Sequence, residues 1–495
     1  MNLGRLCVLP LFSLLSAYAE SSFAVPASPY QPRQPDQAAA AAKSFEKLGF
    51  TVACEQYCGW SILIFRAQAH VSDDDLQKIV CPPFSFVLDL SGSRVSDAGM
   101  KHLARIENLY RLNLRRTRVT GAGLKELAGL PPLSVDVDET QVTGRAIRGL
   151  KGLRNLPWTL HLATMSDESL HCLRENGLLY LLANAGGKRS EHAASTADVM
   201  SFSLHEGANW QYPKQAVHVT DAGLKEIASL TNVAILDLAG GDVTDAGLKD
   251  LAGLQALTAL DLSATKITDV GLRQIANFRN LSDLKLNNTA VTDAGLQELS
   301  RLTNLSALNL YGAKVTAAGL THLAKFNHLS LYLDDRVIAD AAAKDLAGLG
   351  RLSWTLFVGN SDAVLRTLRA NGLLHWLGGA TNDKGLRPAS VHEIVKLALR
   401  GRQVSNAGLA ELGDLTNLAE LDLRFTAVNG TGLKNLAGFT NLSRLDLGYT
   451  SVTDASLTDL AGLKTLATLN LHHTKVTSLG VAELQKALPR CVIAR

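Results

Sequence analysis

The histidines and the glycine-rich segments are the parts of this chain whose residue types could bind a metal or carry out catalysis. The His-Glu pair at 392–393 begins a zinc-binding helix motif, but Lys396 stands where the second histidine is required. His472 and His473 are adjacent, so their side chains point in different directions from a strand or its turn. The segment 186–188 lacks the spacing of a phosphate-binding loop, and the chain has no G-x-S-x-G nucleophile motif. We therefore predict no catalytic site, no metal site and no cofactor.

The N-terminus has the features of an export signal. Residues 1–5 give a short positive start, residues 6–15 an apolar stretch, and residues 17–19 a small-x-small cleavage site. The apolar stretch is too short to cross a bilayer. We expect an exported protein (secreted, periplasmic or on the cell surface) with no integral membrane segment once the signal is removed. An anchor that is never cleaved is the alternative.

The cysteines suit an exported chain only in part. Of the six, Cys7 lies in the export signal, which leaves an odd number to pair in an oxidising compartment. Cys54, Cys58 and Cys81 are the disulfide candidates, because they lie before or at the start of the repeated part of the chain. A Cys54–Cys58 bridge, a Cys58–Cys81 bridge and free thiols all remain open.

Composition narrows the class of protein. The 495 residues carry a formal net charge of +3, and only 5% are aromatic. So few aromatic residues favour a fold that buries the same small aliphatic layer many times, and they disfavour a fold with one large core. The near-neutral charge argues against a nucleic-acid partner, which usually needs a strongly basic face.

An internal repeat of 24 residues determines the elements that must position any site. Each unit begins with Leu-x-Leu, which places two leucines on one face of a short strand and the middle residue on the other. It continues with a variant of VTDAGLxxLA, whose apolar spacing predicts a short helix with Thr and Asp at its start. The first leucines of the strands are at 236, 260, 284 and 308, then at 397, 421, 445 and 469.

These motifs resemble the leucine-rich repeat family. Thr replaces the usual Asn after the strand, as at Thr265 and Thr426, and TDAGL looks like the subtype of exported bacterial repeat proteins and of F-box-associated repeats. The resemblance implies an α/β fold: a right-handed, horseshoe-shaped solenoid with parallel strands on the concave face and short helices on the convex face. It also implies protein recognition without catalysis.

The repeat divides the chain into seven parts. A block that begins Trp-Thr-Leu at 158 and again at 354 interrupts the array twice, and an alanine-rich segment at 38–48 predicts a short helix. The parts are a signal peptide at 1–19, a Pro/Ala-rich linker at 20–43, an N-terminal cap at 44–61, a first run at 62–182, a second run at 183–377, a third run at 378–483 and a C-terminal cap at 484–495.

The middle residue of each Leu-x-Leu faces the concave surface and gives the first set of binding candidates. In the second run these are Asp237, Asp261, Lys285 and Asn309, with Tyr311 beside them. They could attract a basic partner, but we favour the simpler interpretation that Asp and Asn keep an exposed column soluble. Tyr311, Phe425 and Tyr449 are sparse, so no continuous aromatic groove is expected.

A loop insertion at 205–218 gives the second set. It adds about ten residues between a strand and its helix and carries Trp210 and Tyr212. These aromatic side chains either contact a ligand at the rim or fold back to seal the nearby interruption of the array.

We therefore expect a non-catalytic scaffold that binds a protein, or a surface polymer, through its concave face and rim. Two alternatives are a secreted effector that acts as the substrate-recognition arm of a host ubiquitin ligase, and a structural envelope protein. Residues 20–61 are short and Pro/Ala-rich for an F-box bundle, which disfavours the first alternative.

The export signal leads to the first testable prediction. We expect cleavage after Ala19, because residues 17–19 follow the apolar stretch at the spacing of a signal-peptidase site. N-terminal sequencing of the exported protein measures this directly, and a mature protein that still begins at Met1 would contradict it.

Overall fold

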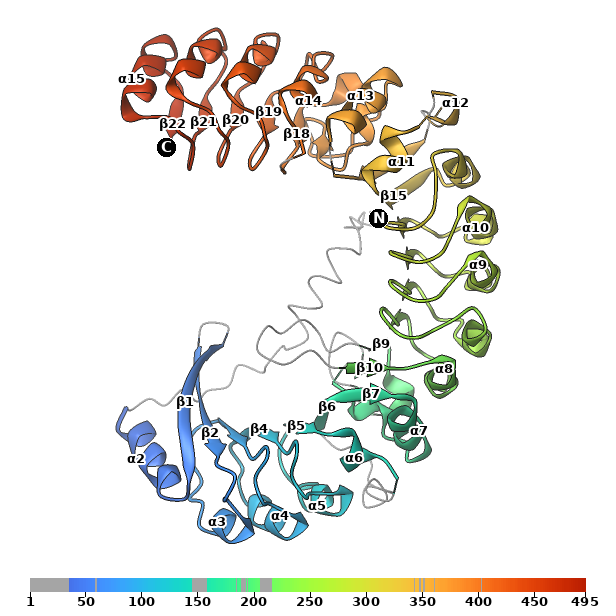
Figure 1. Ribbon diagram of the computed structural model, residues 1–495, viewed down its shortest axis with the longest axis vertical. Helices are drawn as coiled ribbons and strands as arrows, with labels where there is room; N and C mark the ends of the chain where they lie inside the picture. Colours follow the sequence, from blue (N-terminus) through green and yellow to red (C-terminus); the bar gives the residue numbers. More distant parts are fainter. Residues whose placement is uncertain are drawn as a thin grey trace, which may run out of the picture. The chain divides into compact units, whose positions relative to one another are not determined.

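The computed structural model describes residues 35–495 apart from 58–59, 145–157, 184, 188–192, 194, 205–215, 342, 347–348, 350–351, 360 and 402. The chain forms two compact units, Met1–Asp283 and Leu284–Arg495. Within each unit the strands line one face and short helices cover the other (Figure 1). The predicted α/β solenoid of strand–helix repeats is confirmed.

The first unit begins with a helix packed on a hairpin. Helix α2 (Pro35–Glu46) precedes β1 (Phe50–Tyr57) and β2 (Trp60–Ala67), which pair antiparallel. Phe45 is buried and stacks on Phe65 with ring centroids 3.8 Å apart, so it closes the first layer of the core. The helix therefore starts within the segment expected to be a linker, because a run of alanines favours helix and Phe45 anchors it to the core.

Short strands, parallel apart from β8, and short helices then follow one another through the first unit. The strands are β3 (Phe86–Asp89), β4 (Leu109–Asn113), β5 (Leu133–Val137), β6 (Trp158–Leu162), β7 (Thr164–Ser166), β8 (Ala185–Gly186), β9 (Ser201–Ser203), β10 (Ala216–His218), β11 (Ile235–Asp237) and β12 (Ala259–Asp261). The helices are α3 (Asp73–Gln77), α4 (Asp97–Leu103), α5 (Gly121–Glu126), α6 (Glu139–Val142), α7 (Asp167–Glu175), η2 (Leu179–Leu181), η4 (Thr196–Asp198), α8 (Asp221–Ile227), η5 (Gly247–Gly253) and α9 (Asp269–Ile275).

The second unit repeats the same arrangement. Its strands are β13 (Asp283–Lys285), in which the unit begins, β14 (Ala307–Asn309), β15 (His328–Tyr332), β16 (Ser353–Phe357), β17 (Ala380–Thr381), β18 (Lys396–Ala398), β19 (Glu420–Asp422), β20 (Arg444–Asp446), β21 (Thr468–Asn470) and β22 (Val492–Ala494). Its helices are α10 (Asp293–Glu298), η6 (Leu299–Arg301), η7 (Ala318–Leu323), α11 (Asp335–Ala339), α12 (Ala343–Leu346), α13 (Asp362–Ala370), η9 (Leu374–Trp376), η10 (Val391–Glu393), α14 (Asn406–Ala410), η11 (Gly430–Leu436), η12 (Asp454–Leu460) and α15 (Ser478–Ala487).

The two interruptions of the array have the same structure. In each, a nine-residue helix leads to a short 3-10 turn and a two-residue strand, and this strand pairs antiparallel with the first strand of the next sheet. The pairs are β8–β9 in the first unit and β17–β18 in the second. The repeated Trp-Thr-Leu block thus builds the same junction twice.

Burial follows the leucine pattern. Both strand leucines of a repeat are fully buried, as at Leu236 and Leu238. The residue between them, Asp237, stays partly exposed. Among the residues that the structure describes, no helix is long and apolar enough to cross a membrane.

A hydrogen-bonded lock joins each helix to the next. In the regular repeats the Asp at the start of one helical segment accepts two hydrogen bonds from the Thr or Ser that precedes the following one. For example, the Thr244 amide donates to Asp221 Oδ1 over 2.8 Å, and the Thr244 hydroxyl donates to Oδ2 over 2.6 Å. The same arrangement joins Asp73 to Ser96, Asp97 to Thr120, Asp167 to Thr220, Asp245 to Thr268, Asp293 to Thr316, Asp362 to Ser405 and Asp454 to Thr477.

The recurring glycine of VTDAGL makes room for this carboxylate. A Cβ placed on Gly247 would lie 2.4 Å from Asp221 Oδ1, and the glycines at 99, 123, 223, 271, 319, 408 and 480 face the preceding Asp in the same way. The sequence suggested capping by Thr and Asp, and the N-cap bond from the Ala222 amide to the Thr220 hydroxyl at the start of α8 confirms it. That the same Asp also ties two repeats together is visible only in the fold.

We predict that Gly247→Ala lowers the free energy of unfolding by about 1–3 kcal/mol, because the new methyl group collides with the Asp221 carboxylate. Gly253→Ala is the matched control: it lies in the same η5 segment, and a Cβ there meets no atom within 4 Å. It should leave stability unchanged or slightly raised. Denaturant titration of both variants checks this, and equal effects would remove the carboxylate from the explanation. In an Asp221→Ala background the cost of Gly247→Ala should shrink.

Candidate functional site

The predicted column of polar residues between the strand leucines caps the turns that follow the strands. Asp237 accepts a hydrogen bond from the Ala239 amide over 3.0 Å, and Asp261 accepts one from the Ser263 amide over 2.9 Å. In the second unit Asn309 accepts one from the Tyr311 amide over 3.1 Å. Asp and Asn are favoured at such positions because their short side chains satisfy a backbone N–H two residues later. The column thus has a structural role that neither sequence interpretation included.

The remaining predicted residues are placed as follows. Lys285 ends β13, and Tyr311 is a large exposed side chain after β14. Trp210 and Tyr212 lie outside the described residues, so their role stays a prediction. The end of the predicted insertion is strand β10, which pairs parallel with β7.

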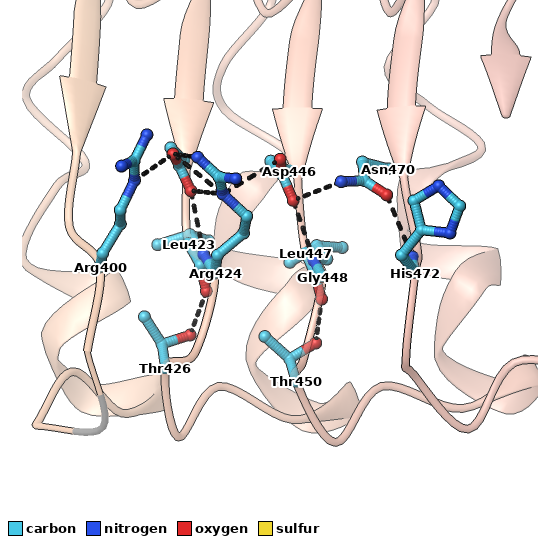
Figure 2. Close-up of polar contacts among 11 residues, drawn as sticks. Arg400, Leu423, Arg424, Thr426, Asp446, Leu447, Gly448, Thr450, Asn470 and His472 are labelled. Carbon is cyan, nitrogen blue, oxygen red and sulfur yellow. Dashed lines mark hydrogen bonds and ion pairs between the residues drawn. The ribbon is translucent and has the colours of Figure 1, made fainter. Parts of the chain in front are cut away.

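The strand face of β18–β21 carries a dense ion-pair network. Arg400 Nε donates to Asp422 Oδ2 over 2.7 Å, and Arg424 Nη2 donates to the same oxygen over 2.8 Å. Arg424 Nε also lies 3.3 Å from Asp446 Oδ2, so Arg424 bridges two neighbouring strands. Figure 2 shows this row, which continues from Asp446 to the Asn470 amide group over 3.0 Å. Two residues earlier in the same strand, Glu420 pairs with Lys396 and Arg444.

Asp422 and Arg424, at the centre of this network, both stay charged. Burial alone would raise the pKa of the Asp422 carboxyl, but hydrogen bonds from Arg424 and Arg400 outweigh burial and hold this pKa below its ordinary value. The hydrogen bond to Asp422 in turn raises the pKa of the Arg424 guanidinium. The network therefore keeps its charges at neutral pH.

Exposure differs sharply between the two signs of charge. The side chains of Arg400 and Arg444 are 59% and 63% exposed, whereas those of Asp422 and Asp446 are 18% and 22% exposed. The carboxylates lie closer to the strand backbone, where they also cap turns, and the arginine side chains lie on the solvent side of them. We call this surface the basic strand face: Lys396, Arg400, Arg424 and Arg444 over Glu420, Asp422 and Asp446.

A stack of three exposed rings runs beside this face. Phe425 and Tyr449 stack with centroids 4.4 Å apart and planes 20° apart, and Tyr449 and His473 stack at 4.3 Å and 20°. Phe425 and Tyr449 remain about half exposed, at 47% and 48%. We call these three residues the aromatic column. The sequence predicts sparse aromatic residues without a continuous aromatic groove. The stack shows that Phe425 and Tyr449 are not isolated, but a row of stacked rings is not a groove.

The backbone of the aromatic column is strained. Phe425, Tyr449 and His473 have φ values of 60°, 59° and 55°, in the left-handed region that bulky residues rarely adopt. Elsewhere the same turn position holds smaller or more polar residues, such as Gly240, Ala264 and Asn288. The turn itself is fixed by Thr426 and Thr450, whose hydroxyls donate to the carbonyls of Leu423 and Leu447 over 2.7 and 2.6 Å (Figure 2). Because these rings are exposed and their backbone is strained, a role in function explains them better than a role in folding.

The sequence contains the signal for the aromatic column. Residues 425, 449 and 473 are each 24 positions apart, one repeat, and each precedes the Thr that ends the turn. Because adjacent parallel strands lie about 4.8 Å apart, any ring that recurs at this period falls within stacking distance of the next. The stack is missed when the aromatic residues are taken one by one and His473 is considered only as a possible metal ligand.

The cysteine candidates are described only in part. Cys54 and Cys81 are exposed and unbridged among the described residues, and Cys58 lies outside them. Both candidate bridges include Cys58, so the Cys54–Cys58 bridge, the Cys58–Cys81 bridge and free thiols all stay predictions.

Other chemistry is sparse in the described part of the chain. No group of three His, Cys, Asp or Glu side chains there is arranged to hold a metal ion. A shallow hollow borders His473 at the end of the aromatic column, lined by Leu471, Thr474, Ser478, Val481 and Arg495.

A family model matches two of the repeats. Residues 229–252 and 254–276 match the model of the leucine-rich repeat. No curated protein matches the chain. Among solved structures, an internalin from Listeria monocytogenes is 17% identical, covering 85% of this chain and 88% of its own, with a TM-score of 0.33. A leucine-rich repeat protein from Leptospira interrogans is 17% identical, covering 80% and 92%, with a TM-score of 0.34. A plant peptide hormone receptor is 14% identical, covering 85% and 75%, with a TM-score of 0.31.

We predict that Phe425→Gly changes the free energy of unfolding by less than about 1 kcal/mol. The loss of one ring stack, about 0.5–1.5 kcal/mol, is offset by relief of the left-handed strain, about 1–2 kcal/mol. Leu423→Ala, two residues earlier and fully buried, should cost about 2–5 kcal/mol. Chemical denaturation of both variants checks this. A cost for Phe425→Gly as large as that for Leu423→Ala would make the column a structural element.

Proposed function

We propose that the protein is a non-catalytic recognition scaffold whose basic strand face binds an acidic segment of another protein. The observation that supports this is the layering of charge: exposed Arg400 and Arg444 lie over carboxylates that are mostly covered. A partner that approaches β18–β21 therefore meets positive charge first. This is the reverse of the basic partner that the acidic column in the sequence suggested.

The layering also keeps the surface ready for binding. Arg400 and Arg424 are held by Asp422, so their guanidinium groups are oriented before a partner arrives. Binding a carboxylate then costs less arginine side-chain entropy than it would if the arginines were unrestrained. The aromatic column along one edge adds apolar area, which rigid rings supply at low entropic cost.

The proposed partner is a protein segment. Preferential binding of a nucleic acid would contradict this. The ring faces inside the column cover one another at 4.3–4.4 Å, so bases of a single strand cannot insert between them at the observed spacing. We also infer that binding takes place after export, on the strength of the N-terminal signal. A ubiquitin-ligase role gains no support from residues 50–57 and 60–67, which form a hairpin where an F-box would have helices.

We predict that labelled poly-glutamate binds the wild-type protein and that poly-lysine does not, with affinity that falls as salt rises from 50 to about 500 mM. The double variant Arg400→Glu and Arg444→Glu should lose most of this binding, because it inverts the exposed charge. Fluorescence anisotropy measures both.

The matched control is Lys434→Glu, a charge reversal on the exposed side of η11, away from the strand face. It should leave binding nearly unchanged. A loss as large as in the double variant would show that net charge alone governs binding. Tighter binding of a single-stranded oligonucleotide than of poly-glutamate would contradict a protein partner.

A further inference from the structure

The aromatic column has no ring in the first repeat of its sheet. Gly401 occupies the turn position of the preceding repeat: its amide donates to the Arg424 carbonyl, as the Phe425 amide donates to the Gly448 carbonyl and the Tyr449 amide to the His472 carbonyl. Rings therefore fill this row at 425, 449 and 473, and Gly401 leaves the next place without a side chain.

Gly401 itself has no side chain to fill that place. Gly401 has a φ of 122°, a conformation that L side chains rarely adopt. A Cβ built on Gly401 would meet no described atom within 4 Å, so the space beside it is open. Strand β19 lies between β18 and β20, and Tyr449 of the β20 repeat covers one face of the Phe425 ring at 4.4 Å. The other face of this ring, its outer face, is therefore on the side of the β18 repeat, to which Gly401 belongs.

A cationic group stands next to the open place. Arg400 directly precedes Gly401 and uses its Nε to bind Asp422. Its side chain is 59% exposed, and its terminal nitrogens have no hydrogen-bond partner among the described residues. A carboxylate could therefore bind the end of Arg400 while Asp422 holds the other side of the guanidinium.

We propose that the outer face of Phe425, above Gly401, receives one aromatic side chain of the bound segment, and that Arg400 binds a carboxylate beside it. This inference rests on the proposed function and specifies the partner: an acidic segment that carries an aromatic residue flanked by Glu or Asp. The incoming ring continues the aromatic column by one place at the same spacing. Specificity then comes from the aromatic residue, while the basic strand face supplies attraction to any acidic chain.

The test compares two labelled peptides that differ at one position, Glu-Glu-Trp-Glu-Glu and Glu-Glu-Ala-Glu-Glu, by fluorescence anisotropy. Wild-type protein should bind the Trp peptide roughly three- to tenfold more tightly, the increment expected of one added ring stack. Phe425→Gly should bind both peptides with the affinity that wild type has for the Ala peptide. Arg400→Gln should weaken both peptides and preserve part of the Trp preference.

Asn288→Gly is the control for the backbone change. Asn288 holds the same left-handed turn position, with φ 54°, and lies outside the basic strand face and the aromatic column. This variant should keep the full Trp preference. Equal binding of the two peptides to wild type, or a Trp preference that survives in Phe425→Gly, would overturn this inference and leave the proposed function standing. Binding of neither peptide would overturn both.

Discussion

The structure depends on a carboxylate that serves two helices at once. An Asp at the start of one helix lies near the positive end of its own backbone dipole and accepts both donors of the Thr that precedes the next helix. The glycine of the next repeat provides the space that the carboxylate occupies. Three positions of the TDAGL motif are thus explained by one contact: Thr donates, Asp accepts, and Gly leaves room.

This lock is insensitive to how many residues separate the two helices. In regular repeats the Asp and its partner are 23 residues apart, but Asp167 reaches Thr220 across 53 residues and Asp362 reaches Ser405 across 43. The array can therefore accept extra strands and loops at its two interruptions while the helix side stays in contact. The added residues appear on the strand side, where β8 and β17 pair antiparallel to the strands that follow.

Regular stacking of the repeats also brings residues that are one period apart in the sequence next to one another on the surface. Once each repeat is held at the same distance from the last, residues at equivalent positions form rows across the strands. In the third run one row alternates carboxylates with guanidinium groups, and the next row stacks three rings. The left-handed turn gives the ring row its exposure, because it directs Phe425 and Tyr449 away from the core. Gly401 holds the equivalent position in the preceding repeat and leaves an open place at the end of that row.

The sequence alone determined the strand–helix period, the burial of the strand leucines and the two interruptions, because all three are local patterns that recur. It also located the helix caps at the Thr of VTDAGL. It could not determine which charges face solvent, since Asp422 and Arg400 are 22 residues apart and only the sheet brings them together. For the same reason Asp237 and Asp261 looked like free surface charges until the turn placed a backbone amide against each. Periodicity defines the rows of the solenoid, but exposure, pairing and backbone strain within a row depend on neighbours in space, and these exist only in the folded chain.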